Sequence, residues 1–293
     1  MMPKAALITV NYGSALTIKR FLANLSRANA FSDLAVIIVD NSSDKKDVAN
    51  IHEANEKFSN VEVLESATNL GYFGAARFAF DHYLMRGQSV PDWVIVCNHD
   101  VIVEDGDFFA KLFAHDPSAA GVIAPRIQIR ESGVDQNPFM RRRPSRLRWG
   151  LYKFAKSSYW TAVVWEGMSR VKRTLKSPVA RSVNVSNEPT FLRSEPIYAA
   201  HGAFFIFSRR YFEAGGYLDG NLFLYGEEIS VAELCRSLKL PVIYVPSLRV
   251  IHNEHESTGR IVSRSTYDYE RKALQYVTSR YLSGSKELTE SKS

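Results

Sequence analysis

Short apolar runs alternate with stretches of helical periodicity over the first 130 residues of the chain. Residues 5–10 and 34–39 contain almost no polar positions, which is typical of strands buried on both faces of a parallel sheet. Residues 18–25 place apolar side chains at the spacing of a helix. Further strands are expected at 61–64, 93–97 and 121–129, with a helix over 73–84. This alternation predicts an α/β fold, with a mostly parallel, doubly wound sheet flanked by helices.

The alternation breaks between about residue 130 and residue 196 and then resumes. Strands are expected at 203–207, 242–245 and 248–251, and helices at 228–238 and 267–282. No run of uncharged apolar residues approaches 18, so no transmembrane helix is predicted. We therefore expect a single domain over residues 1–282, with an insert at about 130–196, and a polar tail at 283–293.

The insert carries the basic excess of the chain. The whole chain has a net charge of +6, whereas residues 141–181 hold twelve Lys or Arg residues and one acid, a net charge of +11. Three of the four tryptophans lie in the same stretch: Trp149, Trp160 and Trp165. The insert is therefore expected to form a basic, aromatic helical segment.

Three interpretations of this insert remain open. Aromatic rings among cations suit an interfacial segment on anionic lipid, with the rings at the level of the headgroups. The same composition would suit nucleic-acid binding through phosphate contacts and base stacking, which is the least expected of the three. A helical hairpin that packs its rings on the main domain and leaves its charges in water would explain the pattern without any partner.

Composition excludes several classes of protein. With 45% hydrophobic and 23% charged residues, the chain matches an ordinary globular protein and not a collagen-like, coiled-coil or disordered one. Its two cysteines, Cys97 and Cys235, lie inside apolar runs and are expected to be buried free thiols. Free thiols fit a reducing compartment, so we expect a cytoplasmic protein.

Polar residues follow four of the predicted strands at the point where each strand ends. They are Asn11-Tyr12, Asp40-Asn41, Asn98-His99-Asp100 and His252. Each alone could simply cap the next helix. Ligands of open α/β sheets bind outside the carboxyl ends of the strands, so four such groups indicate one site at that edge. No G-x-G-x-x-G follows the first strand and no P-loop lysine is present, which disfavours dinucleotide and P-loop sites.

Asn98 and Asp100 offer oxygen ligands for a divalent cation. Mg²⁺ and Mn²⁺ are often bound by few protein ligands, with substrate phosphates and water supplying the rest. His252 could complete such a shell, which would favour Mn²⁺, or it could be a capping or core histidine. No Cys/His spacing suggests structural zinc.

Glu227 and Glu228 place two carboxylates at the start of a predicted helix. Acids at this position are stabilised by the helix dipole, so they could serve only as caps. A carboxylate beside a sugar hydroxyl could instead act as a general base. Neither a Ser-His-Asp arrangement nor a catalytic cysteine context stands out, which disfavours nucleophilic hydrolysis.

These features occur in an order that resembles a known family. The matching segments are Thr9-Val10-Asn11-Tyr12, Val39-Asp40-Asn41-Ser42-Ser43, Asn69-Leu70-Gly71-Tyr72-Phe73-Gly74, Asn98-His99-Asp100-Val101, His201-Gly202-Ala203-Phe204-Phe205, Phe223-Leu224-Tyr225-Gly226-Glu227-Glu228 and Val250-Ile251-His252. Together they resemble family 2 glycosyltransferases with the GT-A fold, particularly bacterial rhamnosyltransferase-like enzymes of cell-surface polysaccharide synthesis. Each segment is weak evidence by itself; the ordered set is strong.

The resemblance implies an inverting, metal-dependent enzyme that uses Mn²⁺ or Mg²⁺. It would move rhamnose or another hexose from a UDP- or dTDP-sugar to a glycan or polyprenyl-diphosphate-linked acceptor. It would work in the cytoplasm, either free or as a peripheral protein on the inner face of the cytoplasmic membrane, where the insert would meet anionic lipid.

The same resemblance implies a role for each matching residue. Asp40 would contact the nucleotide base, and Asp100 with His252 would hold the metal on the diphosphate. Glu228 would deprotonate the acceptor hydroxyl, with Glu227 as the alternative base. The remaining positions would bind the donor or border its sugar: Thr9, Asn11, Asn69, Gly71, Arg77, Asn98, His201 and Gly202.

The chain also departs from the family pattern. The metal motif is usually Asp-x-Asp, and here its first member is Asn98, which removes one ligand charge. The usual base is Asp, and Glu228 is one methylene longer. An Asp that often follows two residues later is Ser230, and an Asn common near Arg77 is missing.

Two other functions remain to be weighed against a glycosyltransferase. A nucleotidyltransferase should carry a basic, glycine-rich phosphate loop near the N-terminus, and none is found. An inactive module that only binds a nucleotide-sugar or a glycan would not need acidic residues at the base and metal positions, where this chain retains them.

Overall fold

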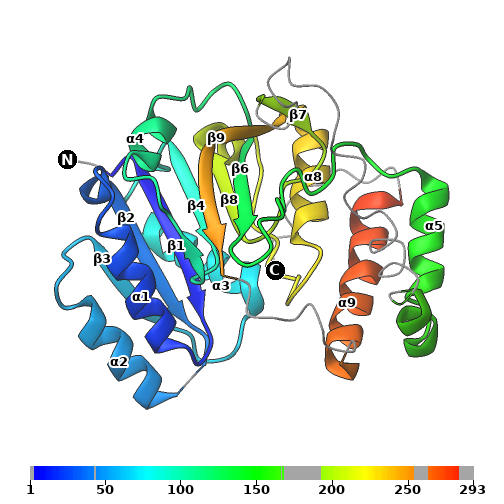
Figure 1. Cartoon of the computed structure of the whole chain (residues 1–293), viewed down its shortest axis with the longest axis horizontal. Helices are drawn as coiled ribbons and strands as arrows, with labels where there is room; N and C mark the ends of the chain where they lie inside the picture. Colours follow the sequence, from blue (N-terminus) through cyan, green and yellow to red (C-terminus); the bar gives the residue numbers. More distant parts are fainter. Residues whose placement is uncertain (1–2, 43, 166, 168–192, 254–262, 284–293) are drawn as a thin grey trace.

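The strands of the chain form one mixed sheet with helices on both faces (Figure 1). The computed structural model describes residues 3–42, 44–165, 167, 193–253 and 263–283. Within these residues the sheet has nine strands, ordered β3-β2-β1-β4-β8-β6-β9-β5, and β7 pairs with β9. The predicted α/β class is therefore confirmed.

The N-terminal half of the sheet is parallel, as the apolar runs predicted. Its strands are β1 (Ala5–Asn11), β2 (Leu34–Asp40), β3 (Val61–Glu65) and β4 (Trp93–Cys97). β1 pairs with both β2 and β4, so it lies in the middle of the parallel group. Successive residues of β1 point to opposite faces: Leu7 packs in one core layer and Ile8 in the other. Both faces are buried, which explains why the strand has no apolar–polar alternation.

The C-terminal half of the sheet contains antiparallel pairs. Its strands are β5 (Val101–Ile102), β6 (Val122–Ile129), β7 (Glu195–Ile197), β8 (Phe204–Ser208) and β9 (Val242–His252). β8 lies between β4 and β6 and is antiparallel to both, whereas β6 and β9 are parallel. The short β5 pairs with the end of β9, which brings the turn after β4 beside His252.

The prediction of two separate strands at 242–245 and 248–251 was wrong, because β9 runs through both. The ladder with β6 shifts register between Pro125 and Arg126, which pair with Val245 and Arg249. A bulge of this kind accommodates the three intervening residues without ending the strand. The polar break in the sequence therefore marked an irregularity in one strand.

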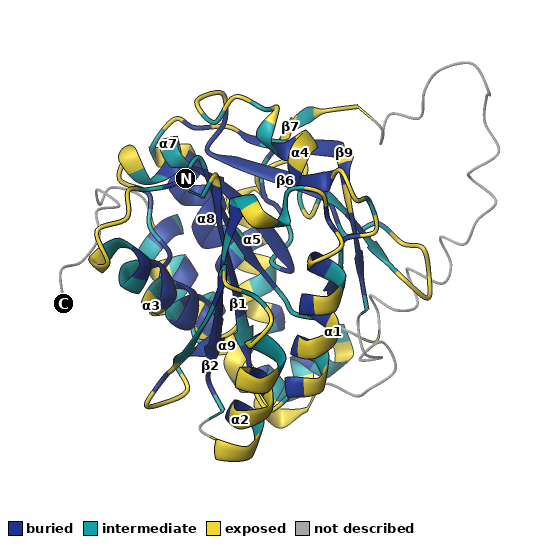
Figure 2. Cartoon of the chain, turned by 90° about the vertical axis from the view of Figure 1, so that its left-hand side faces the viewer, coloured by how far each residue is buried: buried dark blue, intermediate teal, exposed yellow. Residues whose placement is uncertain are grey.

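Helices cover the two faces of the sheet, and their outer sides are exposed (Figure 2). One face carries α1 (Ala15–Leu25), α2 (Lys45–Asn55) and α4 (Phe108–Phe113). The other carries α3 (Gly71–Met85), α8 (Glu227–Ser237) and α9 (Arg264–Val277). Short helical segments are η1 (Phe31–Asp33), α7 (Arg209–Glu213) and η4 (Thr278–Leu282). No helix among the described residues is long and apolar enough to cross a membrane.

The described part of the insert contains helices, as predicted, and packs beside α9 (Figure 1). It forms α5 (Arg146–Ala155) and a second helical stretch over residues 159–165. Trp149 is buried in the same core layer as Val277 of α9. The rings of Tyr159 and Tyr267 meet edge to face with centroids 5.6 Å apart. Some of the aromatic residues therefore pack on the main domain.

Part of the insert lies outside the described residues, as does most of the polar tail. The predicted basic positions in this part are Arg170, Lys172, Arg173, Lys176 and Arg181. Only residue 283 of the tail at 283–293 is described. The proposed division into one domain with an insert remains a prediction.

A buried carboxylate joins the insert to α8. Glu233 is fully buried, and Arg143 donates to its two oxygens over 2.5 and 3.2 Å. Tyr198 donates to the same carboxylate over 2.7 Å and Arg236 over 3.0 Å. These donors lower the pKa of Glu233, outweighing the effect of burial. A buried charge is tolerated when several donors satisfy it in this way.

We predict that Glu233→Ala lowers the free energy of unfolding by about 2–4 kcal/mol, because Arg143 would lose its partner in a partly buried setting. Glu104→Ala is the matched control, since Glu104 pairs with Arg130 and Arg249 at 3.6 and 3.8 Å on the surface. It should cost less than about 1 kcal/mol. Urea unfolding of both variants measures the difference. Equal losses would show that the Glu233 network contributes no more than a surface ion pair.

Candidate active site

A cavity of about 520 Å³ opens at the carboxyl ends of the parallel strands. Val10 and Tyr12 come from the end of β1, Asn41 from the end of β2 and Asn98 from the end of β4. Seven of the residues predicted for the site line it: Asn69, Gly71, Asn98, His201, Gly202, Glu227 and Glu228. The edge of the sheet that the sequence indicated is therefore hollowed, and segments far apart in the chain meet there.

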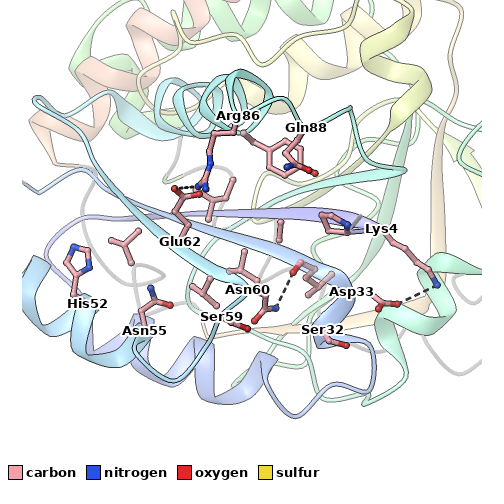
Figure 3. A pocket seen from close by; sticks show the side chains of 18 residues that line it. Lys4, Ser32, Asp33, His52, Asn55, Ser59, Asn60, Glu62, Arg86 and Gln88 are labelled. Atoms are coloured by element: carbon pink, nitrogen blue, oxygen red, sulfur yellow. Dashed lines mark hydrogen bonds and ion pairs between the residues drawn. The ribbon is translucent and has the colours of Figure 1, made fainter. Parts of the chain in front are cut away.

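A larger hollow of about 670 Å³ lies at the opposite, amino-terminal ends of β2 and β3 (Figure 3). Its charged side chains are already paired: Arg86 with Glu62 at 2.7 Å, and Lys4 with Asp33 at 3.5 Å. None of the residues predicted for the site lines it. The smaller cavity at the carboxyl ends is therefore the candidate active site.

Glu227 and Glu228 begin α8 and face this cavity. Oε1 of Glu228 accepts a hydrogen bond from the backbone N–H of Gly202 over 3.3 Å. Burial raises the pKa of Glu228. Burial, followed by the charge of Glu228, raises the pKa of Glu227 to about 8. A carboxylate with a raised pKa is a stronger base, as proton abstraction at neutral pH requires.

The turn before α8 has an unusual backbone that sets the direction of this helix. Tyr225 and Gly226 have φ angles of 68° and 89°, both in the left-handed region. A non-glycine residue rarely adopts such an angle, and when it does the residue is often at a functional site. Gly226 precedes the first helical residue, so the turn decides where both carboxylates begin.

Gly71 brings the start of α3 against this same loop. Its φ is +73°, and a Cβ at this position would lie 2.2 Å from the carbonyl oxygen of Phe223. The next residue, Tyr72, donates its backbone N–H to that oxygen over 2.9 Å. Its hydroxyl donates to the carbonyl of Gly202 over 3.0 Å. Only glycine fits at position 71, and through it α3, the loop and Gly202 are held together.

Asp100 and His252 come together at the β5–β9 pairing, next to the cavity. Nε2 of His252 lies 3.2 Å from Oδ1 of Asp100, and this oxygen is buried without accepting a hydrogen bond. Nδ1 of His252 lies 2.7 Å from Oε1 of Gln136, so the other side of the ring is held as well. The pair therefore places one imidazole nitrogen and one carboxylate oxygen together beside the cavity.

These two side chains fit a metal only in part. No group of three or more His, Cys, Asp or Glu side chains in the described residues could hold a metal ion. Asp100 and His252 supply two ligands, and phosphate oxygens and water would have to supply the others. Asn98 lines the cavity nearby, with its backbone N–H bonded to the carbonyl of Ala203.

His201 is a neutral histidine at the rim of the cavity. Burial and the neighbouring His252 lower its pKa to about 4. Its Nδ1 accepts the backbone N–H of Ala203 over 3.1 Å, which leaves the proton on Nε2. The Asn137 side chain accepts the backbone N–H of His201 over 2.8 Å. The neutral ring can donate a hydrogen bond to a ligand but adds no charge.

Besides Asp100 and His252, four predicted residues do not line the cavity. Thr9 is buried and donates to the carbonyl of Cys97 over 2.9 Å. Asn11 is buried and donates to Asp40 over 2.7 Å, and Asp40 is itself almost fully buried. Arg77 pairs with Asp81 at 3.5 Å. Thr9, Asn11 and Asp40 shape the ends of β1 and β2 from inside, and their contact with a nucleotide remains a prediction, as does that of Arg77.

Sequence reasoning missed two kinds of residue at the site. Asp47 on α2 accepts from Asn11 over 2.6 Å and from the backbone N–H of Ala15 over 2.9 Å. The sequence gives one signal for Asp47, which is its position at the start of a helix. An acidic residue at that position is explained by helix capping alone. Tyr225 and Tyr269 also line the cavity, beside Tyr12 and Tyr72. Tyr269 comes from α9 and stacks on Phe223 with centroids 5.1 Å apart, a contact that the chain order does not reveal.

Comparison with solved structures identifies the fold as the GT-A type. GalNAc-T7, solved with UDP, GalNAc and Mn²⁺, superposes with a TM-score of 0.60 over 95% of this chain, at 14% identity. The Pyrobaculum calidifontis mannosyltransferase PcManGT, solved with GDP-Man and Mn²⁺, gives 0.50 over 96%, at 14% identity. This chain spans 48% and 62% of these two structures, respectively.

Comparison of sequences identifies the family. The family model described as glycosyl transferase family 2 matches residues 6–216, and the chain belongs to this family. It is similar to the N-acetylglucosaminyl-diphospho-decaprenol L-rhamnosyltransferase of Mycobacterium tuberculosis, with 28% identity over 259 residues. The match covers 86% of this chain and 77% of that relative, in two strains of the organism. The resemblance to rhamnosyltransferase-like members of the family is confirmed.

We predict that Gly71→Ala destabilises the protein by at least about 2 kcal/mol more than Gly13→Ala, because its methyl group would overlap the Phe223 carbonyl. Gly13 is the matched control: its φ is +67°, but nothing lies within 4 Å of a Cβ there. Gly13→Ala should cost only the backbone penalty of about 1–2 kcal/mol. Chemical denaturation of both variants separates the free-energy cost of the steric overlap from the cost of the positive φ angle. Equal losses of stability would show that the loop containing Phe223 moves to accommodate the methyl group.

Proposed function

We propose that this chain is an inverting glycosyltransferase that moves rhamnose or another hexose from a UDP- or dTDP-sugar to an N-acetylglucosamine carried on polyprenyl diphosphate. Such a step belongs to cell-surface polysaccharide synthesis. The observation that carries the proposal is the meeting of Glu228, Gly202 and the end of β4 around one cavity in a family 2 glycosyltransferase. The similarity to a rhamnosyltransferase with this acceptor in its name supports the choice of substrates.

The acceptor hydroxyl would approach Glu228. This carboxylate is buried enough to have a raised pKa, and the Gly202 N–H fixes the position of Oε1. As the hydroxyl oxygen bonds to the anomeric carbon, its proton would pass to Glu228, and the bond to the nucleoside diphosphate would break on the opposite face. One displacement of this kind inverts the anomeric centre. Cys97, the residue before Asn98, is no competing nucleophile, since its thiol lies in a fully buried strand, where burial raises its pKa.

Asp100 and His252 would hold a divalent cation, Mn²⁺ or Mg²⁺, against the donor diphosphate. The unbonded, buried Oδ1 of Asp100 and the facing Nε2 of His252 support this role. When bound, such a cation offsets the charge that develops on the departing nucleoside diphosphate. The order of the family motif, with Asn98 in place of its first acid, leaves Asp100 as the charged ligand.

The donor and acceptor are tested by direct transfer. The protein would be incubated with dTDP-rhamnose, UDP-N-acetylglucosamine or GDP-mannose, each with Mn²⁺ and a short-chain polyprenyl-diphosphate N-acetylglucosamine. Transfer from dTDP-rhamnose to this acceptor is the expected result, with an inverted linkage by NMR. A retained linkage, or transfer only to acceptors without a diphosphate, would contradict the proposal.

Glu228→Gln should lower the rate of transfer by about 10²–10⁴-fold, because the amide keeps the shape of the side chain but cannot take the proton. The affinity for the nucleotide should hardly change, since the substitution lies on the acceptor side of the reaction. Steady-state rates and calorimetric binding of nucleoside diphosphate measure the two effects. If Glu227→Gln is inactive and Glu228→Gln is active, Glu227 is the base instead.

Asp100→Ala should reduce turnover by orders of magnitude, because stabilisation of the leaving group by a metal is worth several kcal/mol. The same variant should lose the dependence of nucleoside diphosphate binding on Mn²⁺, which calorimetry with and without the metal would show. Ser118→Ala, on an exposed turn away from the cavity, is the control. Full activity of the unaltered protein in excess chelator would contradict metal dependence.

A further inference from the structure

The insert presents an exposed apolar helix face. Of the exposed large apolar side chains in the described part of the chain, five fall within residues 147–164. On α5 these are Leu147, Leu151 and Phe154, at spacings of four and three residues, so they share one face of the helix. Trp160 and Val164 follow at a spacing of four on the next helical stretch, and Trp160 is 74% exposed.

The opposite side of α5 is buried, so the helix is packed on the domain even though its apolar face is exposed. Trp149 is 8% exposed, and Ala155 is also buried. The next turn is held by Lys156, which pairs with Glu270 of α9 and accepts the Tyr267 hydroxyl at its carbonyl. The helix is therefore fixed on the domain with a second apolar face directed outward, and Figure 1 shows α5 as the outermost helix at this end.

Cations without acidic partners surround the outward face. Residues 141–165 contain seven Lys or Arg residues and no acid. Arg141, Arg143 and Lys156 pair with Glu195, Glu233 and Glu270, respectively. Among the described residues, the remaining four form no ion pair with an acid: Arg142, Arg146, Arg148 and Lys153. An exposed apolar stripe flanked by unneutralised cations complements an anionic, amphipathic surface.

A basic hollow of about 490 Å³ lies next to the stripe, between α5 and the end of the C-terminal helix. Its lining includes Arg143, Arg146, Lys153 and Arg236, with Glu233 neutralising part of their charge. The buried indole N–H of Trp149, also in its wall, has no hydrogen-bond partner. A hollow with this charge suits a phosphate group.

We propose that the outward face of α5 and residues 159–165 docks on an anionic lipid surface, with Leu147, Leu151, Phe154, Trp160 and Val164 entering the interface and the basic hollow taking a lipid phosphate. The choice of lipid as the partner rests on this charge complementarity and on the proposed lipid-linked acceptor. The surface would bring the cavity to an acceptor that lies in the membrane.

Co-sedimentation with vesicles tests the proposal. The whole protein is mixed with vesicles of phosphatidylcholine alone or with phosphatidylglycerol, over a salt series. The unaltered protein should bind the anionic vesicles at low salt and more weakly at high salt, because screening weakens the attraction of the cations. Negligible binding, or equal binding to neutral and anionic vesicles, would overturn the proposal.

Two double variants separate the apolar and the basic contributions. Leu151→Ser with Phe154→Ser should lower the partition constant at least about tenfold at every salt concentration. Arg146→Gln with Lys153→Gln should lower it roughly fivefold per removed cation at low salt and little at high salt. The controls are Met85→Ser, 86% exposed on α3, and Lys19→Gln with Arg20→Gln on α1. Controls that lose as much binding would overturn the assignment to this face.

The phosphate could come from a lipid headgroup or from free phosphate. Inorganic diphosphate is added as a competitor of the vesicles. If it competes only when Arg146 and Lys153 are present, the result supports a phosphate site in the hollow. If Leu151→Ser with Phe154→Ser instead dissociates a dimer in sedimentation velocity while vesicles are ignored, a second copy covers the face and the proposal fails. Transfer to a water-soluble acceptor, measured in parallel, reports on the proposed function independently of lipid binding.

Discussion

The site depends on one backbone contact, between the start of α3 and the loop that precedes α8. The Tyr72 N–H donates to the Phe223 carbonyl over 2.9 Å, and this approach is possible only because residue 71 has no Cβ. Phe223 lies four residues before Glu227, so the same contact sets where α8 begins. The Tyr72 hydroxyl also bonds to Gly202, whose N–H contacts Glu228. A single close approach thus places both carboxylates near the carboxyl end of β4.

The electrostatics of the cavity follow from the same placement. Two adjacent carboxylates with little access to water repel each other, and both have raised pKa values. The N-terminus of α8 and the Gly202 N–H offset part of this cost. On the other side of the cavity, Asp100 faces His252, with one buried oxygen that accepts no hydrogen bond. The arrangement places two carboxylates with raised pKa values on one side of the cavity and the Asp100–His252 pair on the other.

The insert is tied to α8, which carries Glu227 and Glu228, as well as to the surface of the domain. Glu233, which binds Arg143 of the insert, lies on α8 one and a half turns after Glu228. α9 completes the link, since Tyr269 stacks on Phe223 while Lys156 of the insert pairs with Glu270. Packed and hydrogen-bonded contacts therefore connect α5 to the loop that precedes the two carboxylates. The position of the proposed lipid-binding face and the position of the cavity are fixed relative to each other.

The sequence alone determined the parallel half of the sheet, the helical insert and the family. Short apolar runs without alternation are typical of strands that are buried on both faces, and polar residues that end such strands collect at one edge. Motif order then identified seven residues of the cavity, together with the Asp100–His252 pair beside it. These features depend on local sequence or on the order of motifs along the chain, so they can be predicted from the pattern of residues.

Only the tertiary structure decided the rest. The antiparallel placement of β8, the continuity of β9 across its bulge and the arrival of Tyr269 at the cavity depend on pairing between distant segments. The structure also showed that Thr9, Asn11 and Asp40 are buried within the ends of their strands. In the insert, composition could not tell which rings pack inward, because Trp149 and Trp160 have the same chemistry. Which ring is buried depends on which side of the helix packs against α9, and only the tertiary packing sets that side.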